Sequence, residues 1–200
     1  SIIKAIEKKQ IPAAAMNAVQ RTSLIQSSSS LAKRASDIFN EIQPDKESIK
    51  PFLEALKSER DISEGQNSFI KHCSNCHKAH GTGFTLGPDL TSEFRRAEET
   101  IVHDIMAPNS KIVGGYETYV IETHDGRVLS GILANESGSS LALNLPGGLQ
   151  LDVLRKNIKT IKSLDLSLMP ESLGLTLKPK ETANIIAWLQ KPPTRQVLFE

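Results

Sequence analysis

The sequence predicts a mainly α-helical chain that is interrupted by one small β-barrel-like unit. Three observations lead to this fold class. Apolar residues recur every three or four positions through the first ~58 residues. From Tyr116 the repeat changes to two, and from residue 178 it returns to the helical period. We therefore expect a helical prelude at 1–58 and a second domain at 59–200, with the β-unit inserted at 112–163.

The composition is ordinary for a soluble globular protein. Of the 200 residues, 38% are hydrophobic and 24% are charged, and the formal net charge is +1. This charge argues against nucleic-acid binding, and no apolar run reaches the ~18 residues of a transmembrane segment. Aromatic residues make up only 4% of the chain, which suits a core that is partly filled by a non-protein group.

The helical segments can be taken in chain order. The prelude holds two amphipathic stretches, "SLAKRASDIFNEI" and "SIKPFLEALK". A third helix is expected to begin at Ser63, because Gln66 follows three residues later as in a capping box. A loop rich in glycine and threonine follows at 78–92, and "AEETIVHDIM" is helical again until Pro108. The last helix is "KPKETANIIAWLQK", in which Pro179 suits the first turn.

The β-unit is predicted from alternating residues between tight turns. The segments "YETYVIET" and "RVLSGILA" flank the turn "HDG", and "LALNL" and "LQLDV" flank "PGG". Leucines 141, 143 and 145 share one face of their strand. Four or five short strands are expected, followed by a loop that contains "LSLMPESLGL".

Both cysteines of the chain lie in "CSNCH", residues 73–77, and three kinds of site compete for this motif. A structural zinc site needs four ligands, and the second cysteine pair that usually completes one is missing. A dithiol redox motif would follow a strand, whereas a helix precedes these cysteines. The C-x-x-C-H spacing instead favours covalent haem.

The spacing also explains the chemistry. Cys73 and Cys76 lie on one side of a helical turn, so both thiols can add to the two vinyl groups on one porphyrin edge. His77 then directs its imidazole toward the iron. Met169 is the candidate for the opposite ligand, because Pro170 holds its loop and the other two methionines, Met16 and Met106, fit apolar cores.

The remaining basic candidates are less specific. Arg95 and Arg96 follow the loop, and Arg96 is a candidate for pairing with a haem propionate. His72 and His80 lie in polar sequence and are expected to be solvated. His80 would be the first substitute if Met169 is not the ligand.

The stretch "GQNSFIKHCSNCHKAHGTGFTLGPDL" resembles class I cytochromes c. Together with the inserted β-unit and "LSLMPESL", the chain is similar to the haem-binding domain at the C-terminus of large secreted dehydrogenase-like proteins of the Planctomycetes and Verrucomicrobia type. That resemblance implies a cytochrome c fold after a helical-repeat-like segment. It also implies one covalent haem c, export from the cytoplasm to the periplasm or beyond, and a signal upstream of Ser1.

The resemblance assigns roles to single residues. Cys73 and Cys76 match the thioether cysteines, and His77 and Met169 match the two iron ligands. Pro88 matches the proline whose carbonyl accepts the proton of the proximal histidine. Gly65 and Phe69 match positions where the first helix crosses the last, at Ile185 and Trp188.

The predicted function is one-electron transfer from a dehydrogenase partner, or a fused dehydrogenase domain, to a later acceptor. The domain is not expected to be an enzyme on its own. A haem-based gas sensor or peroxidase-like enzyme is the alternative, and it would need a displaceable distal ligand. A third possibility is that the β-unit is a docking module for a partner.

Overall fold

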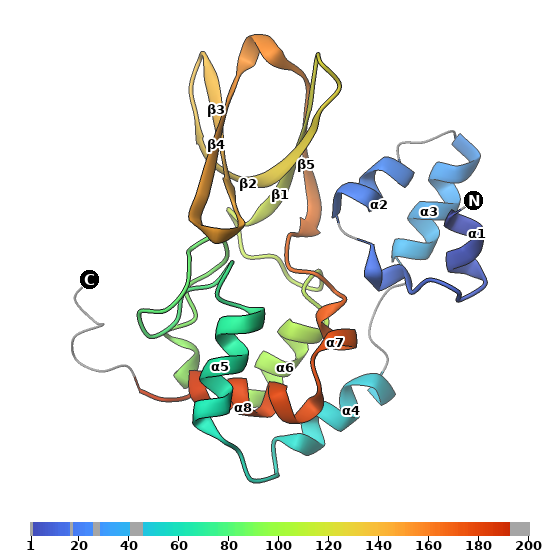
Figure 1. The fold of residues 1–200 in the computed structure, drawn as a ribbon. Helices are drawn as coiled ribbons and strands as arrows, with labels where there is room; N and C mark the ends of the chain where they lie inside the picture. The colour runs from blue at the N-terminus through green and yellow to red at the C-terminus, as the bar shows by residue number, and fades with distance from the viewer. Residues whose placement is uncertain (1, 17, 26–28, 41–45, 193–200) are drawn as a thin grey trace.

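The computed structural model describes residues 2–16, 18–25, 29–40 and 46–192. In Figure 1 the helices α4 to α8 gather below a curved sheet, and α1 to α3 form a separate group beside it. The helices have the following bounds: α1 Ile2–Glu7, α2 Ala18–Ile25, α3 Ser29–Asn40, α4 Lys46–Ala55, α5 Ile62–His72, α6 Glu98–Met106, α7 Leu173–Thr176 and α8 Pro179–Leu189.

Helices α1 to α3 have a core of their own. Ile3, Met16, Ala35 and Phe39 are buried together there. Helix α4, which lies in the predicted prelude, packs elsewhere. Its Phe52 is buried in one cluster with residues of α6 and α8. The apolar face of α4 therefore serves the core of the segment that follows residue 58.

Helices α5 and α8 cross in close contact, as the resemblance implied. A Cβ atom on Gly65 would lie 2.0 Å from the Asn184 carbonyl oxygen, so only glycine permits this approach. The Phe69 and Trp188 ring centroids are 4.7 Å apart, and Ile185 is buried in the same cluster. This crossing places the end of α5 against the last helix.

The start of α5 differs from the expectation. The helix begins at Ile62, and the N-cap is Asp61, whose carboxylate accepts hydrogen bonds from the backbone N–H groups of Ser63 and Glu64 at 2.8 and 3.0 Å. The capping box at Ser63 was therefore wrong. A carboxylate at the N-cap also faces the positive end of the helix dipole, which a serine hydroxyl does not exploit.

The β-unit is a five-stranded antiparallel sheet in the order β4-β3-β2-β1-β5. The strands are β1 Glu117–Thr123, β2 Val128–Glu136, β3 Ser140–Leu145, β4 Leu149–Leu154 and β5 Ile158–Ser167. Among the described residues no ladder joins the edge strands β4 and β5, so the sheet is open rather than closed as a barrel. A whole sheet also makes the chain mixed α and β, which "mainly α" understates.

Strand β5 runs beyond the expected end of the unit at residue 163. It pairs with β1 up to Ser167, with a register shift before the last pair. As a result, the first residues of the segment predicted as loop are strand. The sheet therefore ends within two residues of Met169, on the side of the helices.

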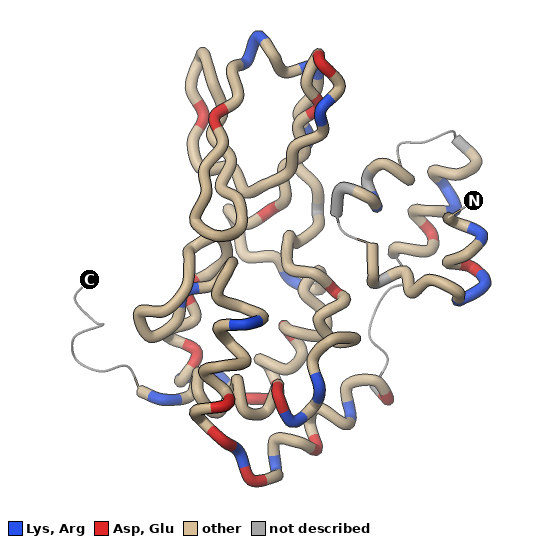
Figure 2. The backbone as a smooth tube through the Cα atoms, in the orientation of Figure 1, with Lys and Arg blue, Asp and Glu red and all other residues tan. Residues whose placement is uncertain are grey.

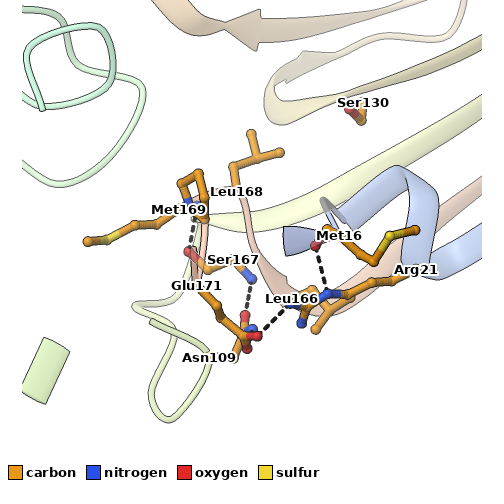
Figure 3. Close-up of a pocket in the computed structure, with 10 residues that line it drawn as sticks. Met16, Arg21, Asn109, Ser130, Leu166, Ser167, Leu168, Met169 and Glu171 are labelled. Atoms are coloured by element: carbon orange, nitrogen blue, oxygen red, sulfur yellow. Dashed lines mark hydrogen bonds and ion pairs between the residues drawn. The ribbon is translucent and has the colours of Figure 1, made fainter. Parts of the chain in front are cut away.

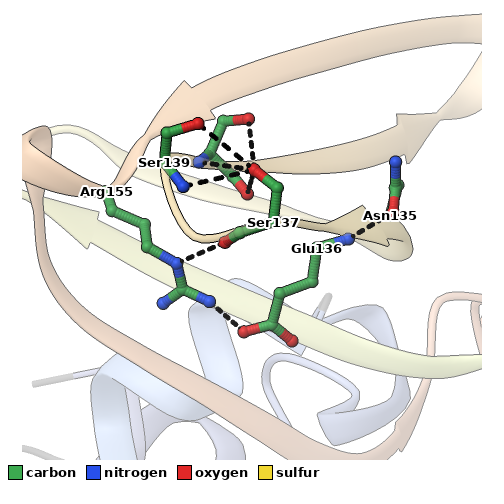
Figure 4. Close-up of polar contacts among 6 residues, drawn as sticks. Asn135, Glu136, Ser137, Ser139 and Arg155 are labelled. Atoms are coloured by element: carbon green, nitrogen blue, oxygen red, sulfur yellow. Dashed lines mark hydrogen bonds and ion pairs between the residues drawn. The ribbon is translucent and has the colours of Figure 1, made fainter.

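The far end of the sheet is held by polar contacts (Figure 4). The Arg155 Nε donates to the Ser137 carbonyl at 2.8 Å, and its Nη2 pairs with Glu136. The Arg155 backbone N–H donates to the Ser139 carbonyl at 2.9 Å. These bonds tie the end of β4 to the β2–β3 turn.

Charged side chains are spread over the molecule. Figure 2 shows basic and acidic residues interspersed on the helices and on the sheet, consistent with the small net charge. In the part of the chain that the structure describes, no helix has the length and apolar character needed to cross a membrane.

Candidate functional site

One cavity of about 270 Å³ lies between the helices and the sheet. Cys73, Cys76 and His77 line it, and so does Met169 from a segment far along the chain. The lining is mostly apolar and comes from the loop after the cysteines, α6, α8 and the sheet. Its apolar members include Leu86, Leu90, Ile101, Ile105, Ile112, Ile132, Leu173, Ile185 and Leu189.

The end of α5 arranges the motif. Cys73 caps the helix, and its carbonyl accepts hydrogen bonds from the N–H groups of Cys76 and His77 at 3.0 and 2.8 Å. This turn brings both thiols and the imidazole to the cavity. Burial, with a smaller contribution from the nearby Cys76, raises the pKa of Cys73 to about 12, and burial also raises the pKa of Cys76. Both sulfurs are therefore neutral thiols in the polypeptide without a bound group.

His77 is oriented by its second ring nitrogen. Nδ1 lies 2.8 Å from the Pro88 carbonyl oxygen, and because a carbonyl only accepts, Nδ1 carries the proton. Burial lowers the pKa of His77, while the bond to Pro88 opposes that shift. The neutral ring thus keeps Nε2 free as a donor to a metal.

The loop at Gly87 supports this orientation. Its N–H donates to the Cys76 carbonyl at 2.7 Å. A Cβ atom at residue 87 would lie 2.5 Å from the His77 Cε1 atom, so the backbone passes directly against the imidazole. The role of Gly87 was missed from the sequence, although glycine immediately before the proline of "GPDL" was a usable signal.

Met169 reaches the cavity from the segment between β5 and α7. Its N–H donates to the Ser167 hydroxyl at 3.1 Å. In Figure 3 the Met169 side chain extends away from Arg21 and Glu171, on the other side of its own backbone. Met16 and Met106 are buried in two other clusters, as expected.

These observations describe a helix that ends in C-x-x-C-H, an oriented imidazole and an apolar cavity beside them. Residues 62–126 match the family model of cytochrome c. The match supports a cytochrome c domain, which implies covalently bound haem and electron transfer. It includes α5, the cysteine motif and α6, and it stops in the β1–β2 turn. No curated protein matches the chain.

The residues fit haem c. The C-x-x-C-H motif supplies two thiols three residues apart, and His77 supplies a free Nε2 that the Pro88 carbonyl and Gly87 hold in place. Met169, which lies outside the matched range, adds a thioether to the same cavity. In an apolar setting, an imidazole and a thioether are the two iron ligands of a His/Met haem site, and the two thiols are the groups that attach its porphyrin.

Arg96 also lines this cavity, but its guanidinium already has partners. Nη1 lies 2.9 Å from Glu93 and Nη2 lies 2.7 Å from Asp104. A propionate would have to share this arginine with two carboxylates. Arg95 is exposed, and its guanidinium lies over the Phe94 ring at 5.0 Å.

Glu93 is a second site residue that sequence reasoning missed. It is 8% exposed and lines the cavity, whereas its sequence neighbourhood, "TSEFRR", reads as surface. Burial raises the pKa of its carboxyl, and attraction to Arg96 offsets only part of that rise. The folded state therefore binds a proton at this group more readily than the unfolded chain does.

Glu93→Gln is expected to change how stability depends on pH. Because the pKa of Glu93 in the folded state lies above the ordinary value of 4.5, the unfolded chain releases this proton first as pH rises. The wild type therefore loses stability as pH rises from the unfolded-state pKa to the folded-state pKa. The variant lacks this loss. Denaturant unfolding between pH 4 and pH 7 should show the variant gaining stability relative to wild type as pH rises, and an unchanging difference would contradict the assignment.

The flanking histidines are less solvated than expected. The Nε2 atoms of His72 and His80 are both buried and have no hydrogen-bond partner among the residues that the structure describes. His72 lines the cavity, while the His80 ring packs edge-on against Trp188 with centroids 4.9 Å apart. Because His80 is absent from the cavity lining, it is poorly placed to replace Met169.

The β-unit touches the cysteine motif directly. The Gly147 N–H donates to the carbonyl of Asn75, which lies between the two cysteines, at 2.8 Å. A Cβ atom on Gly148 would lie 2.5 Å from the Phe84 ring. The β3–β4 turn thus covers the loop that carries the thiols, which no local sequence pattern indicated.

Proposed function

We propose that this chain is a one-electron carrier that uses one covalently attached haem c. The observation that carries the proposal is that His77 and Met169 line the same cavity as the two cysteines. When bound, the haem supplies an iron that changes oxidation state by one electron. With both His77 and Met169 holding it, the iron would have no open position for a substrate.

The chain's own residues would each do one task. Cys73 and Cys76 would attach the haem through thioether bonds, and the Pro88 carbonyl would hold His77 with Nε2 toward the iron. Met169 would be the second side chain to hold the iron, through its thioether sulfur. The apolar lining would exclude water and so favour the less charged, reduced state.

The donor is proposed to be a redox partner protein or a dehydrogenase domain fused to this one, and the compartment the periplasm or another extracytoplasmic space. Both proposals follow from the resemblance of the C-x-x-C-H segment and the "LMP" loop to exported haem domains. The alternative, a haem-based gas sensor or peroxidase-like enzyme, would require Met169 to leave the iron.

The test is a pyridine haemochrome assay on the chain after export through a c-type maturation pathway, followed by exposure of the reduced protein to carbon monoxide. One haem c per chain and slow or negligible binding of carbon monoxide at neutral pH are expected. A colourless protein with two titratable thiols would refute the haem assignment. Rapid binding of carbon monoxide would instead favour the sensor or peroxidase alternative.

A further inference from the structure

The segment that carries Met169, residues 167–170, separates two cavities, and we call this segment the wall. Residues 167–170 line the 270 Å³ cavity on one side and a second cavity of about 170 Å³ on the other. The second cavity lies against the helical prelude, with Met16 and Arg21 among its lining residues (Figure 3). A wall with space on both sides has few packed atoms to hold it, so its position depends on specific bonds.

Those bonds converge on Asn109, in the loop after α6. The Asn109 side-chain oxygen accepts from the Ser167 N–H at 2.7 Å, and its amide nitrogen donates to the Glu171 carboxylate. Ser167 in turn accepts from the Met169 N–H. Glu171 and Ser167 therefore anchor the wall at its two ends, with Met169 between them.

The prelude completes this network through Arg21 of α2. The Arg21 Nη2 lies 2.5 Å from the Glu171 carboxylate, and the two side chains are only 4% and 7% exposed. The Arg21 Nε donates to the Met16 carbonyl at 2.9 Å, and the guanidinium lies over the Phe39 ring at 5.2 Å. Arg21 is thus held by contacts within the prelude, and its Nη2 atom reaches Glu171 at the end of the wall.

We propose that the helical prelude keeps Met169 at the iron by bracing its segment through the Arg21–Glu171 ion pair. Arg21 and Glu171 are positioning residues, because they act through Met169 and reach no atom of the haem site. The proposal rests on the proposed function, in which Met169 is the axial ligand. It assigns the prelude a role in the redox site itself rather than in linkage alone.

The physical reason is that removing Arg21 leaves the buried Glu171 carboxylate without its ion-pair partner. Without Arg21, the buried Glu171 carboxylate keeps the Asn109 amide as its one partner among the described residues, so it gains by turning toward water. Turning outward would also break the bond from Glu171 to Asn109, the side chain that holds the Ser167 N–H, so the wall would lose an anchor. The second cavity supplies room for that movement, and the movement carries Met169 away from His77's side of the first cavity.

Arg21→Met tests the brace, because methionine keeps most of the apolar bulk against Phe39 and removes the charge. The variant should lose much of the weak far-red absorption that oxidised haem iron shows with a methionine sulfur ligand. Its midpoint potential should fall, and carbon monoxide should bind the reduced protein about tenfold faster or more, which needs only ~1.4 kcal/mol of lost ligand stabilisation. Arg21→Lys should restore part of each property.

Arg34→Met is the matched control. Arg34 also lies in the prelude and pairs with a glutamate, Glu7, but both side chains are exposed, at 40% and 37%, and neither touches the wall. This variant should leave the far-red absorption, the potential and the carbon monoxide rate as in wild type. Circular dichroism and the haemochrome assay confirm folding and haem content for every variant.

The outcomes separate this inference from the proposed function. If the wild type lacks covalent haem or the far-red absorption, the proposed function fails first. If the wild type has both, and Arg21→Met keeps all three properties unchanged, only the brace is overturned. Should Arg21→Met not fold, Glu171→Gln decides by the same three measurements, because it removes the ion pair from its other end and leaves Arg21 in place.

Discussion

Gly65→Ala is expected to destabilise the protein by about 3 kcal/mol, the upper range for overpacking a closely packed contact. The added Cβ atom would lie 2.0 Å from the Asn184 carbonyl oxygen and 3.0 Å from the Trp188 Cβ. Both obstacles belong to α8, and one of them is backbone, so the helices must separate. In a helix with free space at this position, the same change would stabilise the protein by up to ~1 kcal/mol. A measured loss of stability would therefore indicate the close contact between α5 and α8.

The measurement is denaturant unfolding of the haem-containing protein, followed by circular dichroism. Gly114→Ala is the control, because a Cβ atom at that exposed position meets nothing within 4 Å. It should change the free energy of unfolding by less than ~0.5 kcal/mol. Equal stability of Gly65→Ala and wild type would mean that α5 and α8 do not approach as closely as the structure shows.

Met169→Ala is expected to have the largest effect on the redox site. Methionine opposite histidine raises the potential of haem iron, so its removal should lower the midpoint by a substantial part of the ~0.8 V that axial ligands control. The vacated position should let the reduced protein bind carbon monoxide rapidly. Haem content should stay at one per chain, since Cys73 and Cys76 are untouched.

Met106→Leu is the matched control for this change. Met106 is 7% exposed in the cluster that α4, α6 and α8 share, and leucine conserves most of its volume. Its spectrum and potential should equal those of wild type. If Met169→Ala retains the far-red absorption of methionine-bound iron, another side chain is the ligand and the assignment of Met169 is wrong.

The sequence predicted the elements that depend on neighbours along the chain. Helices α4, α5, α6 and α8, the hairpin turns at "HDG" and "PGG", and the return to helix after the sheet all lie where periodicity and turn residues indicated. The errors concern the ends of elements, which depend on contacts that periodicity does not show. Asp61 outcompeted Ser63 as the cap, and β5 continued to Ser167 because β1 offers it a partner.

The sequence alone determined the chemistry of the C-x-x-C-H motif, because one helical turn brings Cys73, Cys76 and His77 together whatever the rest of the chain does. Only the tertiary structure decided that Met169 shares their cavity, that Glu93 is buried beside it, and that Arg21 reaches Glu171. These contacts join residues far apart in sequence. They depend on how helices and sheet pack, and no short-range pattern encodes that packing.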